Sequence, residues 1–214
     1  MVQALAVIWT HAGLRSNEIM RLDKECAHFQ TNDVVHEDGT ITPAGSLCYL
    51  DIPASKTFKP FVKPVAIAVK KYIDAWLKDR PINQAALFDE RTGRKVSYLF
   101  QFRGKRIGSG VINGTIIPIL CAKAGVPLED SRGRITSHRG RASAVTALAS
   151  VPQGMSLIEL MQWSGHSSPN STLHYIRVRP TKLAASFIKA DQMANMVSIL
   201  IDHDVIARHP YLPA

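Results

Sequence analysis

Five side chains in this sequence have the types and the spacing needed for chemistry on a phosphate ester. They are Arg15, His138, Arg141, His166 and Tyr175. A guanidinium can bind two phosphate oxygens through parallel hydrogen bonds, and an imidazole can exchange a proton near neutral pH. A tyrosine phenol can act as a nucleophile and form a covalent intermediate. Two cations and two imidazoles around a phenol therefore indicate attack on a phosphodiester bond.

The order of these residues along the chain favours one shared site. His138 and Arg141 are three residues apart, so one face of a helix presents both. His166 follows Gly165, which lets the backbone turn sharply, and Tyr175 comes nine residues later. Each piece alone has an ordinary explanation, such as a surface arginine or a half-buried tyrosine. The joint pattern Arg, H-x-x-R, G-H and Tyr is much more specific.

The charge of the chain indicates a polyanionic partner. The 214 residues include 26 Lys and Arg against 17 Asp and Glu, which gives a net charge of +9. Residues 103–141 hold eight of the cations and two acids, and residues 56–71 hold five lysines and no acid. Because both clusters lie beside the candidate site residues, nucleic acid is favoured over a merely solvated basic surface.

The remaining composition predicts a cytoplasmic globular protein of one domain, or of two small ones. No apolar run is long enough to span a bilayer, and the N-terminus carries no secretory signal. The three cysteines, Cys26, Cys48 and Cys121, are an odd number without C-x-x-C spacing, so we expect reduced, buried thiols. No clustering of acids, histidines or cysteines has the spacing of a magnesium or zinc site.

Apolar periodicity predicts a mainly helical α+β fold with a small antiparallel sheet of about three strands within residues 24–63. Residues 87–88 are expected to form a short buried link, and residues 125–134 a loop. In the helix of residues 109–124, Gly114 and Pro118 introduce strain. The expected helices are 2–11, 15–22, 64–79, 109–124, 138–150, 156–163, 170–178 and 181–202.

The motifs resemble those of the tyrosine recombinases, the phage-integrase family, and the resemblance covers the catalytic domain from about residue 2 to residue 180. It implies that Tyr175 attacks double-stranded DNA, forming a 3′-phosphotyrosyl link and releasing a 5′-hydroxyl without metal or ATP. It also implies that Arg15, Arg141 and His166 hold the phosphate, and that His138 assists proton transfer at the tyrosine.

The resemblance further implies a lysine in a β-turn that protonates the leaving 5′-oxygen. Lys56 in Ser55-Lys56-Thr57 fits best because it lies between two predicted strands, with Lys59 next and Lys63 a weaker choice. Glu18 lies one helical turn after Arg15 and is expected to brace it from behind. Further DNA contacts are expected from Lys59, Arg132, Arg134 and Arg139.

Two positions depart from the family pattern without removing a catalytic atom. Gly140 and Ser164 stand where the family usually has leucine. A glycine inside a helix costs roughly 0.5–1 kcal/mol relative to alanine. The departures indicate a divergent branch, similar to the recombinases of some transposons.

The domain organisation is expected to be incomplete. The sequence begins almost at the Arg15 motif, so the N-terminal domain that closes the family's clamp on DNA is missing. Residues 1–180 would be the catalytic domain, and residues 181–214 an amphipathic helix and tail. The apolar face of this helix would suit docking on a neighbouring subunit and packing on its own domain equally well. The family assembles as a tetramer on DNA, although an isolated fragment could be a monomer.

Several functions compete with a site-specific recombinase or integrase. A type IB topoisomerase uses similar chemistry, but size and motif spacing favour the recombinase. A catalytically inactive DNA-binding regulator from a decayed mobile element is the principal alternative. A basic structural or RNA-binding protein fits poorly, since no RNA-binding motif is visible. The expected setting is the nucleoid of a bacterial or phage-bearing cell.

Overall fold

The computed structural model describes residues 1–55, 59–151, 155–176 and 188. The chain divides into two compact units, Met1–Ile176 and Arg177–Ala214. Of the expected helix at 181–202, only Ile188 is among the described residues.

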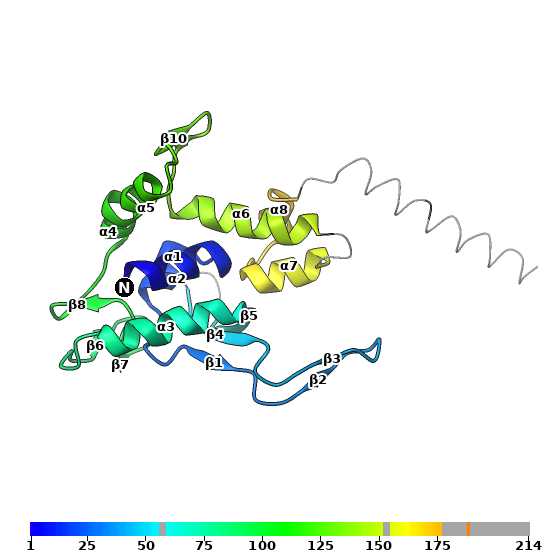
Figure 1. Ribbon diagram of the computed structural model, residues 1–214, viewed down its shortest axis with the longest axis horizontal. Coiled ribbons are helices and arrows are strands. Elements are labelled where there is room, and N and C mark those ends of the chain that lie inside the picture. The colour runs from blue at the N-terminus through cyan, green and yellow to red at the C-terminus, as the bar shows by residue number, and fades with distance from the viewer. Residues whose placement is uncertain (56–58, 152–154, 177–187, 189–214) are drawn as a thin grey trace, which may run out of the picture. The chain divides into compact units, whose positions relative to one another are not determined.

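Helix α1 (Val2–His11) lies between α3 (Ile67–Asp79) and α6 (Ser137–Ser150) and contacts both (Figure 1). Leu5 and Ile8, three residues apart, are fully buried between these helices. The short helix α2 (Ser16–Met20) follows α1 after a turn, and the chain later adds α7 (Leu157–Ser164) and α8 (Pro169–Leu173).

The main sheet has three antiparallel strands, as predicted. Its order is β1 (Ala27–Phe29), β4 (Cys48–Ile52) and β5 (Phe61–Val65). Cys48, Leu50 and Ile52 alternate into the core, as expected for a half-buried strand. Helix α3 packs on this sheet and buries Val69, Ile73 and Trp76.

Four small hairpins extend from this core. Two predictions are wrong here, because the supposed link at 87–88 and the supposed loop at 125–134 each contribute to a hairpin. Phe88 is 64% exposed, since the apolar side chain sits on the open face of its two-stranded ribbon. The hairpins are β2 (Val34–Val35) with β3 (Ile41–Thr42), β6 (Leu87–Asp89) with β7 (Arg94–Val96), β8 (Gln101–Phe102) with β9 (Lys105–Arg106), and β10 (Glu129–Asp130) with β11 (Gly133–Arg134).

Two helices differ from their predicted form because of proline. Pro64 does not open α3. It lies in β5, an edge strand where a proline is tolerated, and pairs there with Tyr49 of β4. The expected helix at 109–124 forms as α4 (Ser109–Val111), a π-helical turn η1 (Ile112–Ile116) and α5 (Ile117–Lys123). The π turn relieves the clash that the Pro118 ring would make with the carbonyl of Gly114.

The remaining expectations have mixed outcomes. All three cysteines are buried and none forms a disulfide, as predicted. Helix α8 ends at Leu173, earlier than expected, so Tyr175 follows the helix rather than lying within it. In the part of the chain that the structure describes, no helix is long and apolar enough to cross a membrane.

Candidate active site

A tight turn after α1 forms the floor of the candidate site. Gly13 has φ +56°, and a side chain there would lie 3.1 Å from Ala144 of α6 and 3.2 Å from the ring of Trp163 of α7. Only glycine combines this left-handed conformation with so close an approach. The turn therefore joins three helices at one point and starts α2 with Arg15 as its N-cap residue.

Glu18 connects the two candidate phosphate-binding arginines. Its Oε1 lies 2.7 Å from Nη1 of Arg15, and its Oε2 accepts a hydrogen bond of 2.8 Å from the Arg15 backbone N–H. Oε2 also lies 3.8 Å from Nη1 of Arg141. The carboxylate is buried and lies behind both guanidiniums, which leaves the Arg15 side chain 30% exposed toward solvent. This geometry agrees with the bracing role that the sequence suggested for Glu18.

Arg141 is held almost completely inside the protein. Its Nη1 donates to the carbonyl oxygen of Gly13 at 3.0 Å, and its Nη2 donates to the carbonyl of Ser164. Burial, followed by the charge of Arg15, lowers the pKa of Arg141 to about 10. The guanidinium stays charged at neutral pH and is fixed in place before any substrate arrives.

The unusual Gly140 has a packing explanation that the sequence did not provide. A Cβ atom at this position would lie 2.6 Å from Cδ1 of Trp9, whose ring covers the first turn of α6. Trp9 also donates its Nε1–H to the carbonyl oxygen of Ser137 at 2.8 Å. Trp9 therefore fills the space beside Gly140, which leaves no room there for a larger side chain.

His166 is positioned by a second left-handed glycine. Gly165 has φ +63° and ends α7, and a Cβ atom there would lie 2.9 Å from the Phe61 ring. The His166 Nδ1 lies 2.9 Å from the hydroxyl of Thr172. Where that hydroxyl donates to Nδ1, the ring proton is on Nε2 and can be offered to a ligand.

Tyr175 lies beside this histidine. The two rings are stacked, with centroids 5.9 Å apart and planes 13° apart. The backbone carbonyl of Tyr175 accepts a hydrogen bond of 3.2 Å from Thr146 on α6, the helix that also carries Arg141. The tyrosine is half-buried, with its ring against the ring of His166.

Burial and the surrounding cations together keep His166 uncharged at neutral pH. Burial is the largest cause that lowers its pKa, to about 4, and the charges of Arg141, Arg15 and Lys63 act in the same direction. At neutral pH the imidazole is therefore neutral and can donate a hydrogen bond without carrying charge.

Lys63 lies deeper in the site than the sequence suggested. Its side chain is fully buried, with Nζ 2.6 Å from the carbonyl oxygen of Ala12 and 3.5 Å from the centroid of the Trp163 ring. Burial, followed by the charge of Arg141, lowers its pKa well below the usual value for lysine. Phe61, Lys63 and Val65 alternate on the inward side of β5, and this period of two was the signal that could have revealed Lys63.

The structure does not bring every predicted residue into this group. His138 lies on the first turn of α6, but it is exposed and forms no hydrogen bond within the described ranges. Lys56 lies outside the described residues. Lys59 is exposed between β4 and β5, which confirms only that this segment connects two strands.

The predicted DNA-contacting arginines lie on or beside the β10–β11 hairpin. Arg132 and Arg134 are exposed. Arg139 instead makes two hydrogen bonds of 2.9 Å to the carboxylate of Asp130 and one of 3.0 Å to the carbonyl of Gly133. Arg139 thus fastens the hairpin to α6, and its hydrogen bonds lower the pKa of Asp130.

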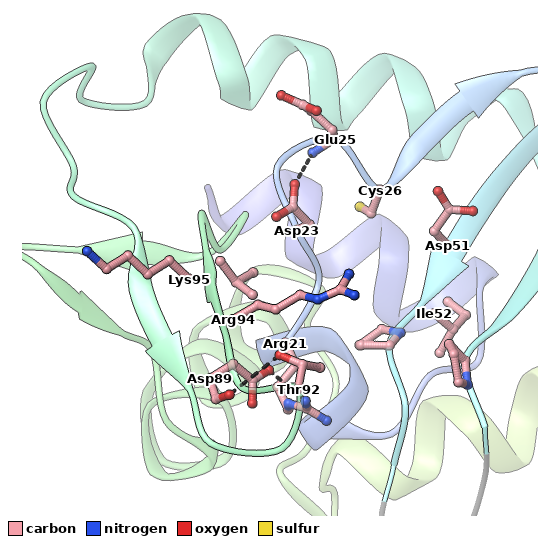
Figure 2. A pocket seen from close by; sticks show the side chains of 13 residues that line it. Arg21, Asp23, Glu25, Cys26, Asp51, Ile52, Asp89, Thr92, Arg94 and Lys95 are labelled. Atoms are coloured by element: carbon pink, nitrogen blue, oxygen red, sulfur yellow. Dashed lines mark hydrogen bonds and ion pairs between the residues drawn. The ribbon is translucent and has the colours of Figure 1, made fainter.

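A separate buried ion pair lies between α2 and the β6–β7 hairpin. Arg21 bonds to Asp89 at 2.6 Å and also donates to the carbonyl of Ala54, two residues before Lys56. Figure 2 shows Arg21 and Asp89 at one side of a hollow of about 680 Å³. The contact links the helix that begins after Arg15 to the segment that leads into Lys56. No pattern in the sequence predicted it.

The geometry is suited to binding a phosphate and compensating its charge. Two guanidiniums, a neutral imidazole and a phenol approach one region from α2, α6, α7 and the segment after α8. Preorganised donors of this kind can each contribute about 3–4 kcal/mol to a transition state. Among the described residues, no group of three or more His, Cys, Asp or Glu side chains could hold a metal ion.

Solved structures with a similar fold include two recombinases and a transposon integrase. XerA recombinase matches with 19% identity and a TM-score of 0.56, over 87% of this chain and 55% of that chain. The XerH site-specific recombinase bound to its difH substrate matches with 18% identity and a TM-score of 0.55, over 86% and 44%. The Tn1549 transposon integrase in complex with transposon right end DNA matches with 19% identity and a TM-score of 0.59, over 88% and 58%.

The chain thus spans about half the length of these solved proteins. No curated protein matches its sequence. The phage integrase family model matches residues 2–182, which include every residue of the candidate site. The chain belongs to the phage integrase family.

Proposed function

We propose that this chain is the catalytic domain of a site-specific DNA recombinase that cuts and rejoins strands through a phosphotyrosine. The observation that carries the proposal is the stacking of Tyr175 on His166, with centroids 5.9 Å apart, beside the buried Arg141. A nucleophile, a neutral donor and a fixed cation then share one small region.

The chemistry is a transesterification at phosphorus. The Tyr175 Oη attacks the scissile phosphate, the bond to the 5′-oxygen breaks, and a 3′-phosphotyrosyl link forms. Arg15 and Arg141 bind the non-bridging oxygens, and His166 donates its ring N–H to one of them. Phosphoryl transfer depends mainly on such positioning and charge compensation. The energy of the broken ester is kept in the new one, so rejoining needs no nucleotide cofactor.

Two protons must move during this step. The phenol proton passes to a base, for which His138 is the candidate by family likeness, since a histidine can accept a proton near neutral pH. The leaving 5′-oxygen takes a proton from Lys56. Both assignments rest on the resemblance, and the exposure of His138 means that bound DNA would have to cover it.

Double-stranded DNA is the proposed partner. The solved XerH and Tn1549 integrase structures are complexes with their DNA substrates, and this chain carries a net charge of +9. Residues 1–180 would hold the chemistry, and residues 181–214 would dock on a neighbouring subunit of an assembly on DNA.

The decisive experiment is covalent trapping on a nicked suicide substrate made from the ends of the mobile element that encodes the chain. We expect a protein–DNA adduct without Mg²⁺ or ATP, and none with Tyr175→Phe. An adduct that survives Tyr175→Phe would show that another residue is the nucleophile. If the wild-type chain forms no adduct, the alternative of an inactive DNA-binding regulator is correct.

A further inference from the structure

Two hairpins between α3 and α4 carry a dense set of exposed cations. We call them the basic hairpins, residues 87–106, which comprise β6–β7 and β8–β9. Glu90 is their one exposed acid, because Asp89 is buried against Arg21. Phe88 and Phe102 are also exposed there, by 64% and 51%. The exposed cations are Arg91, Arg94, Lys95, Arg103, Lys105 and Arg106.

The tip of the second basic hairpin contains a strained arginine. Phe102 pairs with Lys105, so Arg103 and Gly104 form a two-residue turn, with φ +48° and +71°. Positive φ at both positions is the type I′ geometry, which favours Asn-Gly. Among the described residues, Arg103 is the one non-glycine with positive φ. Asparagine would be less strained than arginine at this position. The presence of Arg103 therefore indicates a role beyond forming the turn.

A hollow connects the basic hairpins to the helix that follows Arg15. Its volume is about 370 Å³, and its lining includes Asn17 of α2 together with Arg91, Tyr98 and Arg106. The Arg106 guanidinium lies 5.1 Å from the Tyr98 ring, which holds the cation at the edge of this hollow. The lining also includes Glu90 and the buried ion pair of Arg21 and Asp89, so cations outnumber acids along the hollow from α2 to the hairpins.

The β8–β9 hairpin is also anchored at its base. Gln101 donates to the carbonyl of Ala85 at 2.8 Å, and its own carbonyl accepts from Gln84 at 2.9 Å. Both hydrogen bonds fix β8 against the segment that leads into β6. The exposed cations of this hairpin thus extend from strands that are anchored to the protein, and not from a long loop.

We propose that the basic hairpins bind the sugar–phosphate backbone of duplex DNA outside the segment held at Tyr175. The choice of DNA as occupant rests on the proposed function. Guanidiniums bind phosphate oxygens bidentately, and exposed aromatic rings beside them can pack on the sugars. The hollow lined by Asn17, Arg91 and Arg106 would let one backbone run from the active site to the hairpin tip.

The first test is the salt dependence of binding to a mixed-sequence duplex of about 30 base pairs, measured by fluorescence anisotropy. Each lost phosphate contact lowers the slope of log Kobs against log [NaCl] by about one. We expect Arg103→Gln/Arg106→Gln to lose about two units of slope and to bind about tenfold or more weakly at moderate salt. The matched control, Lys71→Gln/Lys78→Gln on exposed positions of α3, should keep the wild-type slope.

Two outcomes of this comparison would overturn the proposal. An unchanged slope in the hairpin variant would mean that these arginines do not touch DNA. An equal loss in the α3 control would mean that net charge alone, and not this surface, controls binding.

Arg103→Asn separates a binding role from a folding role. Asn-Gly suits a type I′ turn better than Arg-Gly, so the melting temperature should rise while the salt slope falls by about one. A lower melting temperature with an unchanged slope would show that Arg103 serves the fold, and the proposal would fail.

The outcome can be told apart from that of the proposed function. The hairpin residues lie outside the catalytic group, so the double variant should still form the Tyr175 adduct at low salt. Conversely, Tyr175→Phe should lose the adduct and keep the wild-type salt slope. A wild-type chain that forms no adduct would refute the recombinase, and the slope comparison would still decide whether the hairpins bind DNA.

Discussion

The ammonium group of Lys63 lies 3.5 Å from the centroid of the Trp163 ring, inside the protein. The same nitrogen is 2.6 Å from the carbonyl oxygen of Ala12, next to the Gly13 turn that also accepts a hydrogen bond from Arg141. Lys63 therefore joins β5, α7 and the turn before Arg15. These contacts and its full burial predict that Lys63 supports Arg15 and Arg141 and does not protonate a leaving oxygen.

This arrangement predicts how two lysine variants will differ on a modified substrate. With a 5′-bridging phosphorothiolate, sulfur leaves without needing a proton, so only a defect in the proton donor is rescued. We expect Lys56→Ala to regain most of its cleavage rate on this substrate. Lys63→Met should be slow on both substrates, by about tenfold to a hundredfold, because the phosphate-binding groups are misplaced.

The measurement is the single-turnover rate of adduct formation on each substrate. Circular dichroism shows whether both variants keep the wild-type fold. Rescue of Lys63→Met, with no rescue of Lys56→Ala, would identify Lys63 as the donor and contradict the supporting role.

The lowered pKa of His166 makes stability depend on pH in acid. Its folded-state pKa is about 4, against an ordinary value of 6.5. The unfolded chain therefore binds this proton more readily, and the free energy of unfolding falls as the pH drops from 6.5 toward 4. Between pH 7 and pH 4.5 we expect His166 to account for a loss of about 2 kcal/mol.

Urea unfolding of wild type and His166→Gln at the two pH values checks this expectation. Carboxylates that titrate in the same range affect both proteins, so the difference between them isolates the histidine. Equal acid sensitivity in the two proteins would mean that His166 is not buried in its neutral form.

The sequence pointed to the residues of the candidate site more clearly than to the packing that supports them. Arg15, Arg141, His166 and Tyr175 stood out because their types and spacing are unusual, and the structure places them near one another. Lys63 was ranked last of three lysines, since a lysine is normally solvated and nothing local shows that Trp163 will cover it. A contact between residues a hundred positions apart has no signature in either segment.

The errors in the fold have the same origin. Pro64 favours the start of a helix locally, but pairing with Tyr49 across the sheet extends β5 through it. At Pro64, pairing between strands outweighed the local preference. The β8–β9 hairpin had no prediction, because its turn lacks the Asn-Gly signal and has Arg103 in that place.

The Gly140 position predicts a conflict between helix propensity and packing. Replacing a helical glycine by alanine usually stabilises a helix by about 0.5–1 kcal/mol. Here the new Cβ would lie 2.6 Å from Cδ1 of Trp9, whose indole N–H is bonded to Ser137. We therefore expect Gly140→Ala to destabilise the protein by about 1–3 kcal/mol.

Thermal unfolding of Gly140→Ala, with and without Trp9→Leu, tests this conflict. The smaller leucine should make room for the new methyl group, so the double variant should lose less stability than the two single changes added together. A stabilised Gly140→Ala would mean that the indole moves away at little cost.

The last prediction concerns the carboxylate behind the two arginines. Glu18→Gln keeps the shape of the side chain but removes the charge that lies 2.7 Å from Arg15 and 3.8 Å from Arg141. Two guanidiniums would then repel each other without a shared anion in a buried position. We expect adduct formation to slow by about tenfold or more, with roughly 1–3 kcal/mol of stability lost. Glu25→Gln is the matched control, because Glu25 is 81% exposed and lies outside the site. If both variants cleave at the wild-type rate, the arginines keep their positions without Glu18, and the preorganisation that we assign to this carboxylate is absent.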